Sequence, residues 1–257
     1  MLTFGEGRIL FWEGASLWVL AAGPEVGEAG VKGTFHSHHA VQVTLALDGW
    51  FELETADHRV AAAAAAVAPD TRHAIRAGGL VAFVYIEPES RPGRAVFRKL
   101  FDERPLTAVP LDLLGDLPRR LAAAFKDPGV TDAKLTDLGR AIIARLAGGV
   151  EVASPDVRVR KVIAWAASHV DGPVRLADAA AIAGLSPDRL RHLFVQQTGL
   201  PFRTYVLWLR LLKAVEAFAG GDSLTEAAHA AGFSDSAHFS RTFRRMFGLA
   251  AAALRLA

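Results

Sequence analysis

Residues 183–194 read AGLSPDRLRHLF, and residues 231–243 read AGFSDSAHFSRTF. In both stretches Ala-Gly is followed by an apolar residue, a serine and a run with two large apolar residues four positions apart. A glycine in the left-handed conformation ends a helix, and a serine or aspartate begins the next one by capping its free N–H groups. Each stretch therefore predicts a helix, a tight turn and a second helix, with Ser234 or Asp235 as the second cap.

The residues around these stretches support the same interpretation. Ser186 is expected to cap its helix, with Pro187 at the first helical position, where a missing N–H costs nothing. Ser223 and Glu226 have the spacing of a capping box for a short helix before the second turn. Residues 202–219 have the apolar spacing of one long amphipathic helix, which would hold the two units at a fixed separation.

Composition and charge limit the function classes. The chain has 257 residues and a net charge of +2, but residues 155–257 hold 13 Lys and Arg against 8 Asp and Glu, and residues 1–154 carry a balance of −3. The C-terminal part is thus the candidate for binding a polyanion. The absence of cysteine excludes disulfides, thiolate metal sites and cysteine nucleophiles.

Nothing in the sequence indicates catalysis, export or a membrane span. No Gly-x-Ser-x-Gly nucleophile elbow and no phosphate-binding loop occurs. Glu6 and Arg8 interrupt the segment where a signal peptide would be apolar, and no apolar run is long enough to cross a bilayer. We therefore expect a cytoplasmic protein that is not an enzyme.

The chain divides into three segments by pattern. Residues 1–93 contain short β-branched and aromatic runs separated by glycine and proline, which favours a small barrel or sandwich. Residues 94–154 have helical spacing broken by prolines, and they would form a linker or a dimerisation segment. Residues 155–257 are predicted to be all helical. The six alanines of residues 61–66 have helical propensity, but their context favours a strand.

Residues 158–248 resemble the DNA-binding domain of the AraC/XylS family of transcription regulators. The resemblance rests on Leu185-Ser186-Pro187, on TGLPF at 198–202 and above all on FSRTFRRMFG at 239–248. Two departures stand out. Arg175 replaces the usual Ser or Thr before the first turn, and AAAALR at 250–255 replaces a proline and an aromatic residue.

The resemblance implies which residues face DNA. The base-reading positions fall on Asp188, Arg191, His192, Ser236, Ala237, His238, Ser240 and Arg241. The residues that we expect to contact phosphates are Arg203, Arg210, Arg244 and Arg245. Arginine can pair bidentately with guanine, aspartate accepts from cytosine and alanine meets the thymine methyl, so these residue types suit the major groove.

The first 90 residues resemble the cupin-type sensor domain that many of these regulators carry. Gly33, His36, His38 and Gly49 match the first cupin signature, but Gln42 stands where metal-binding cupins have glutamate. Pro69, Thr71 and His73 match the second signature in part. Because strand side chains alternate, the polar residues share one face. The expected effector pocket consists of His36, His38, Gln42, Thr44 and His73.

Three interpretations of these histidines compete: metal ligands, a metal-free ligand pocket or structural residues. Gln42 removes the one charged ligand, so we expect no metal cofactor. His39 should point the other way, toward the surface or an interface. Arg72 and Arg76 lie near the expected barrel mouth, where they would attract an acidic effector or be ordinary surface charges.

The sequence thus predicts a two-domain α+β protein with a cupin-like β-barrel and a C-terminal all-α domain of two helix-turn-helix units. The expected partners are double-stranded promoter DNA, a small-molecule effector and, as one possibility, a second copy of the chain. Two alternatives stay open: a metal-dependent cupin enzyme with a helical appendage, and a regulator whose N-terminal domain binds a protein.

Overall fold

A computed structural model describes residues 4–22, 30–102 and 104–256. The predicted domains also contain residues 1–3, 23–29, 103 and 257, which lie outside the described residues. The chain forms two compact units. The first comprises Met1–Pro88, Pro92–Val152 and Phe243–Ala257, and the second comprises Glu89–Arg91 and Ala153–Thr242.

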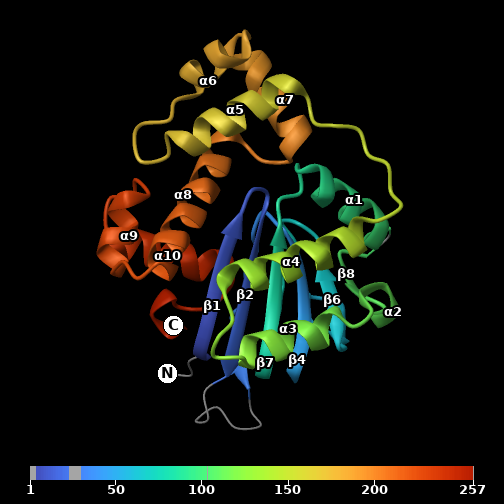
Figure 1. Ribbon diagram of the computed structural model, residues 1–257. Helices are drawn as coiled ribbons and strands as arrows, with labels where there is room; N and C mark the ends of the chain where they lie inside the picture. Colours follow the sequence, from blue (N-terminus) through green and yellow to red (C-terminus); the bar gives the residue numbers. More distant parts are fainter. Residues whose placement is uncertain (1–3, 23–29, 103, 257) are drawn as a thin grey trace. The chain divides into compact units, whose positions relative to one another are not determined.

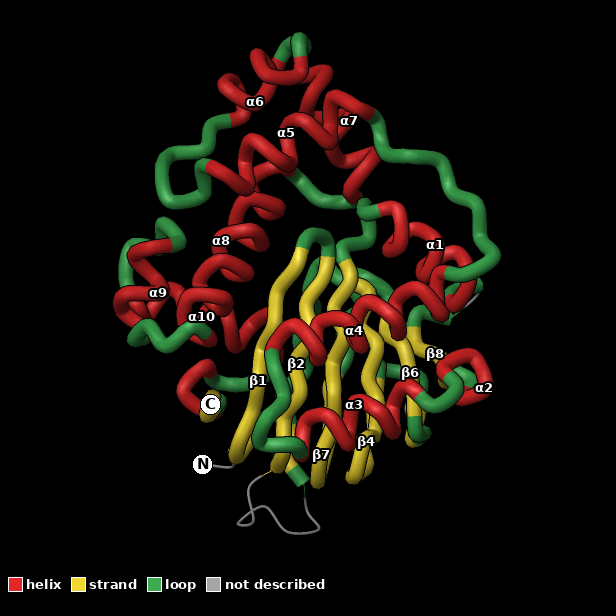
Figure 2. Tube along the Cα trace, in the orientation of Figure 1, coloured by secondary structure: helices red, strands yellow, loops and turns green. Residues whose placement is uncertain are grey.

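In the part of the chain that the structure describes, the first unit is built on a mixed sheet of nine strands. The sheet is drawn in yellow in Figure 2. The strands are β1 (Phe4–Trp12), β2 (Ala15–Ala22), β3 (Val31–Lys32), β4 (Val41–Glu54), β5 (Arg59–Ala61), β6 (Ala64–Val67), β7 (Ala74–Ile86), β8 (Leu106–Ala108) and β9 (Arg255–Leu256). The main path runs β8-β6-β4-β7-β2-β1-β9, and only the β1–β9 pair in it is parallel. Among the described residues no pairing joins β8 to β9, so the sheet is open rather than the closed barrel that we predicted.

Helices cover one face of this sheet. They are α1 (Arg91–Leu100), α2 (Leu111–Leu114), α3 (Leu117–Lys126) and α4 (Asp132–Ala147), of which α3 and α4 lie across the strands in Figure 1. Leu17, Val43 and Val84 of the sheet share one buried core with Leu121 of α3 and Ile142 of α4. The segment predicted as a linker is therefore part of the first unit, because its apolar stripe covers the apolar face of the sheet.

The alanine run shows how packing overrides propensity. Ala64, Ala65 and Ala66 form strand β6, are all buried, and pair with β4 on one side and, through Ala65 and Ala66, with β8 on the other. The strand that context favoured for residues 61–66 is thus confirmed at Ala61 and at residues 64–66, whereas Ala62 and Ala63 form a bend between β5 and β6. Alanine has the best helix propensity, but that preference is small beside the pairing and burial that the sheet provides.

The second unit is helical. It contains α5 (Val157–Ser168), α6 (Leu176–Ala183), α7 (Pro187–Thr198), α8 (Phe202–Ala219), α9 (Leu224–Ala230) and the start of α10 (Ser236–Phe247). The long helix α8 has the bounds that the apolar spacing predicted. In Figure 1 α8 runs between the α5–α7 group and α9. Its residues Tyr205, Trp208 and Val215 are buried, as expected of the inward face.

Helix α10 is shared between the two units. Its first seven residues, 236–242, belong to the second unit, whereas residues 243–247, the 3-10 turn Ala251–Ala253 and β9 belong to the first. The second unit thus begins at Ala153, and residues 243–257 belong to the first unit with the sheet. In the described part of the chain no helix is both long and apolar enough to span a membrane.

Candidate nucleic-acid interface and ligand pocket

The first helix-turn-helix unit consists of α6 and α7. Gly184 ends α6 in the left-handed conformation, with φ of 63°. Ser186 then caps α7 by accepting a hydrogen bond from the Arg189 backbone N–H at 3.4 Å, and Pro187 follows at the first helical position. Arg175, at the N-cap of α6, makes no side-chain cap bond, so this departure leaves α6 without the cap that Ser or Thr would give.

The second unit consists of α9 and α10. Ser223 and Glu226 form the predicted capping box, with backbone N–H groups donating in both directions at 2.9 and 3.2 Å. The cap of α10 is Asp235, which accepts from the His238 backbone N–H at 2.6 Å. That bond lowers the pKa of the Asp235 carboxyl, because it stabilises the charged form. Ser234 instead donates to Asp235 at 3.1 Å.

Both recognition helices bury an apolar face and present a polar one. Leu190 and Phe194 of α7 and Phe239 of α10 are fully buried within the second unit. The predicted base-reading residues are placed as follows: Asp188, Arg191, His192, Ala237 and Arg241 are exposed, and Ser236, His238 and Ser240 are half-buried. Their accessibility is compatible with base contact, and that role stays a prediction.

Two of these residues already interact with each other. Arg191 Nη1 lies 3.1 Å from Asp188 Oδ1, one helical turn away, and both side chains are more than half exposed. An exposed pair of this kind contributes little to stability. The pair instead orients the Arg191 guanidinium along α7, and DNA would have to compete for it.

The four predicted phosphate contacts do not have equal surroundings. Arg203, Arg244 and Arg245 are exposed. Arg210 is half-buried, and its guanidinium donates to the carbonyl oxygens of Val170 at 2.9 Å and Gly172 at 2.8 Å. The prediction is therefore weaker for Arg210, since two of its donors already fix the loop between α5 and α6.

The face of the sheet opposite the helices carries the predicted pocket. Strand register places Gln42 opposite Tyr85, and Thr44 opposite Phe83, which in turn lies opposite Trp18. His36 and His73 face each other across an isolated bridge with backbone bonds of 2.8 and 2.9 Å. Together with His38, their ring nitrogens gather within 4.8 Å of one another. The five predicted pocket residues thus lie together.

Gln42 is the centre of a buried hydrogen-bond network. Its Oε1 lies 2.8 Å from His38 Nε2 and 3.2 Å from His73 Nε2, and its Nε2 donates to Thr44 at 2.9 Å. His36 Nδ1 and His73 Nδ1 donate to the carbonyls of Thr34 and Thr71, both at 2.8 Å. Since a carbonyl only accepts, these bonds set the tautomers of both histidines.

Burial keeps the three imidazoles neutral at pH 7. Desolvation lowers the pKa of His36 and of His38 to about 4, and it lowers the pKa of His73 well below its usual value. Neutral imidazoles are good metal ligands, and zinc accepts three of them with an oxygen as fourth partner. Oε1 of Gln42 is uncharged and already lies 2.8 Å from His38 Nε2, so it brings no negative charge to such a site. The expectation of a pocket without metal stays a prediction.

The expectation for His39 is wrong. This residue is only 3% exposed, and its Nδ1 lies 3.0 Å from the carboxylate of Asp70, whose φ of 58° is left-handed. Asp70, in the turn before β7, is the partner of this buried ring, and local alternation does not reveal that contact. Arg72 and Arg76 are exposed and lie over the rings of Phe35 and Trp50, at 5.6 and 5.5 Å from the ring centres.

Sequence reasoning missed the aromatic wall of this pocket. Trp18 lies 4.7 Å from the ring centre of Phe247 and 6.2 Å from that of Phe243, and Tyr85 lies 5.5 Å from Phe247. The space left inside is about 20 Å³. It is lined by Trp18, Leu20, His36, Gln42, Ile75, Phe83, Tyr85, Phe243, Phe247, Leu249 and Leu254. Strand alternation could have identified Phe83 and Tyr85, but nothing local places Phe243 and Phe247 here.

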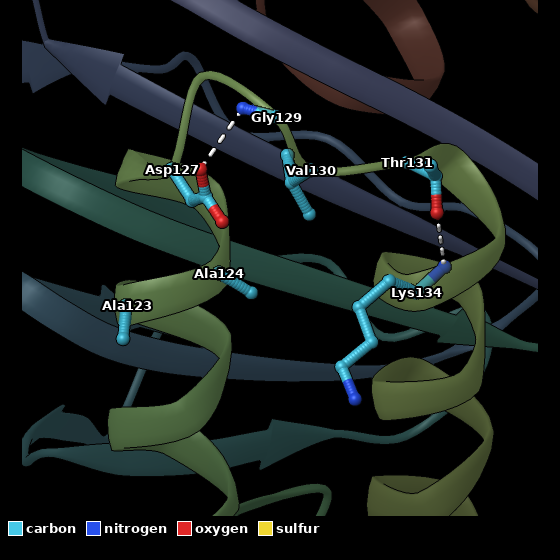
Figure 3. Close-up of a pocket in the computed structure, with 7 residues that line it drawn as sticks. All are labelled: Ala123, Ala124, Asp127, Gly129, Val130, Thr131 and Lys134. Atoms are coloured by element: carbon cyan, nitrogen blue, oxygen red, sulfur yellow. Dashed lines mark hydrogen bonds between the residues drawn. The ribbon is translucent and has the colours of Figure 1, made fainter.

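A larger and more open hollow of about 470 Å³ lies between the end of α3 and the start of α4 (Figure 3). Asp127 accepts from the Gly129 N–H at 2.9 Å, and Thr131 caps α4 by accepting from the Lys134 N–H at 3.3 Å. These polar groups thus form hydrogen bonds within the turn itself. The seven described residues that line the hollow do not converge as those around Gln42 do.

The C-terminal part of the chain is similar in sequence to known proteins. Residues 179–257 match a family described as a helix-turn-helix domain. The transcriptional activator RhaS of Klebsiella pneumoniae strain 342 is 37% identical over 98 residues, which are 38% of this chain and 35% of that protein. RhaS of Citrobacter koseri is 34% identical over 122 residues, or 47% and 44%. The chain thus matches less than half the length of these curated relatives.

Solved structures match the fold over nearly the whole chain. ToxT from Vibrio cholerae O395 has a TM-score of 0.59 at 12% identity, over 93% of this chain and 95% of that one. An apo variant of ToxT from strain SCE256 gives 0.60 at 11% identity, over 95% and 97%. At these identities the likeness concerns the fold alone. Residues 179–257 thus match the helix-turn-helix domain family, and the curated relatives that are similar to this part of the chain are transcriptional activators.

Proposed function

We propose that the protein is a sequence-specific DNA-binding transcription regulator controlled by a small molecule that binds in the N-terminal, cupin-like unit. The observation that carries this proposal is the pair of capped helix-turn-helix units joined by α8, in the part of the chain that matches the helix-turn-helix family. Promoter DNA is thus the macromolecular partner, and the cytoplasm the location.

In this proposal α7 and α10 each enter a major groove, on successive turns of one face of the DNA about 34 Å apart. The exposed residues Asp188, Arg191, Ala237 and Arg241 would read bases, with His192, Ser236, His238 and Ser240 beside them. Arg203, Arg244 and Arg245 would position the duplex through phosphates. One chain holds two different reading helices, so its site need not be palindromic.

The test is selection of bound sequences from a random duplex library by the full chain, followed by a salt titration of the selected duplex and of a scrambled one. We expect one enriched asymmetric sequence and an affinity that falls steeply as salt rises. Binding that is equal for both duplexes would leave only a non-specific polyanion binder. No salt-dependent binding to either would overturn the proposal.

The sensor role rests on the buried polar cluster around Gln42 and on the fold. The solved structures of the same fold include ToxT from Vibrio cholerae with a bound unsaturated fatty acid. A site with a few converging polar groups and apolar walls is the usual form of a small-molecule pocket. A second copy of the chain as partner belongs to the proposal too, and sedimentation of the purified protein tests it.

A further inference from the structure

The predicted effector pocket is filled by the protein itself. Residues 243–256, here called the C-terminal clasp, contribute Phe243, Phe247, Leu249 and Leu254 to its lining. The remaining space of about 20 Å³ has room for about one water molecule, which needs about 10–15 Å³. A ligand pocket commonly measures about 300–1,000 Å³. A ligand can therefore enter only if some of the lining side chains move out of this space.

The two sides of the pocket differ in how firmly they are held. The walls that carry Trp18, Gln42 and Tyr85 are strands β2, β4 and β7, each of which is paired along both edges. The clasp is held by ring contacts, by two hydrogen bonds from Thr34 to the Gly248 carbonyl at 2.9 and 3.1 Å, and by the two-residue pairing of β9 with β1. The clasp is thus the side that can move.

The lining also sets the chemistry of the ligand. Among the residues that the structure describes, this lining consists of aromatic and aliphatic side chains together with His36 and Gln42, and it includes no Lys, Arg, Asp or Glu. Its other polar groups are the hydroxyl of Tyr85 and the ring N–H of Trp18. Burial keeps His36 neutral at pH 7. An ionised ligand would lose its hydration without gaining a counter-charge. A flat, uncharged ligand with one hydrogen-bonding group fits.

Resting on the regulator function proposed above, we infer that the effector is an uncharged aromatic molecule that replaces the rings of Phe243 and Phe247 against Trp18 and Tyr85. Ligand binding and docking of the clasp then exclude each other. Because Phe243 follows Arg241 by two residues on the same helix, displacement of the clasp acts directly on the helix that reads DNA. The pocket and the second helix-turn-helix unit are linked through α10.

The probe is 2-naphthol, an uncharged bicyclic ring with one hydroxyl, and naphthalene-2-sulfonate is its charged counterpart. Calorimetric titration of the full chain should detect 2-naphthol and should give at least tenfold weaker binding for the sulfonate. Phe247→Ala opens space at the ring's own position, so it should bind 2-naphthol at least tenfold more tightly than the wild type. Absence of 2-naphthol binding to this variant, or equal affinity in both proteins, overturns the inference.

Amide hydrogen exchange tests the exclusion itself. Saturating 2-naphthol should speed exchange in residues 243–256 and at the N–H of Thr34, while exchange in β4 is unchanged or slower. Binding that slows exchange in the clasp would mean that ligand and clasp are bound together, against the inference. This readout needs no DNA, so its failure and the failure of the regulator function are distinguishable.

A glycine substitution should mimic the ligand. Gly248 has φ of 72°, and an added Cβ would collide with the His36 ring and lie 2.5 Å from the Thr34 carbonyl. Gly248→Ala should therefore speed exchange in the clasp without ligand. Gly149→Ala is the matched control, because Gly149 has φ of 81° in the same unit but nothing within 4 Å of the added Cβ. Equal exchange in the two variants contradicts the inference, and thermal melting verifies that both fold.

Discussion

At the scale of single residues, the exposed arginines of α10 separate specificity from affinity. Arg241 is one of the predicted base-reading residues, and Arg244, about one turn later, is a predicted phosphate contact; both side chains are exposed. Replacement of Arg241 by alanine should cost about 1–3 kcal/mol on the selected duplex and relax the preference at one base pair. Fluorescence anisotropy against single-base variants of that duplex measures both effects.

Arg244→Ala is the matched comparison on the same helix. It should weaken binding to all duplexes alike and reduce the salt slope by about one. Uniform weakening by Arg241→Ala, with no change in base preference, would assign Arg241 to the phosphates as well.

A buried residue pair should anchor the second unit. The hydroxyl of Tyr205 on α8 donates to the carboxylate of Glu89, and both residues are nearly inaccessible. Tyr205→Phe removes the donor but keeps the ring, so we expect a loss of about 1–3 kcal/mol in the unfolding free energy, because a buried carboxylate loses a partner. Denaturant titration measures it. In a double-mutant cycle with Glu89→Ala, which removes the acceptor, additive losses would show that the bond does not couple the two residues.

At the scale of elements, the turns of the two helix-turn-helix units look alike in sequence and differ in packing. Gly184 and Gly232 both have left-handed φ, at 63° and 75°. A Cβ at Gly184 would meet nothing within 4 Å, whereas one at Gly232 would lie 2.5 Å from the Val170 carbonyl oxygen and 3.2 Å from Nε of Arg210. The hydrogen bond from Arg210 holds the Val170 carbonyl in place, so the loop cannot easily move away from an added Cβ.

The two alanine variants should therefore differ in stability. Gly184→Ala should cost about 1–2 kcal/mol, from the left-handed backbone alone. Gly232→Ala should cost about 2–5 kcal/mol, because overpacking against a fixed carbonyl adds to that strain. The two variants are compared by thermal melting. Equal losses would mean that the Val170 loop moves freely.

The same comparison explains what sequence reasoning could and could not predict. Helix ends are local, so Ser186, the Ser223–Glu226 box and the bounds of α8 follow from spacing and caps, and the structure confirms them. The local sequence does not determine which distant residues an apolar side chain packs against. Phe239 and Phe243 have the same pattern, yet Phe239 is in the second unit and Phe243 in the first. The open sheet and the covering helices were missed for the same reason.

At the scale of the molecule, the clasp explains the departure at the end of the chain. A proline and an aromatic residue are expected there, but the alanines form the turn Ala251–Ala253, which is buried at both ends, and β9 then joins the sheet beside β1. Small side chains allow the chain to pass close to the sheet. In the expected pattern this last segment anchors the final helix of the DNA-binding domain. In this chain it lines the pocket of the first unit instead.

The buried histidines should make the stability of the first unit depend on pH. His36 and His38 have a pKa of about 4 in the folded chain, against about 6.5 when unfolded. Between these values the unfolded chain binds more protons, so stability is full above pH 6.5 and is lost as the pH falls toward 4. Each histidine contributes up to about 1.4 kcal/mol per pH unit. The shift of His73 has the same sign.

Hydrogen exchange of the β4 amides, corrected for the intrinsic rate at each pH, measures this dependence in the first unit alone. His38→Gln keeps a polar side chain of similar length but cannot titrate. The slope of stability against pH between pH 6.5 and 4.5 should therefore become shallower by the contribution of one histidine. The other ionisable influences on His38 are His36, which lowers its pKa as well, and Asp70, which raises it, and both remain in the variant. An unchanged slope in His38→Gln, or stability that does not fall with pH in the wild type, would mean that water reaches these rings and that the pocket is open rather than filled.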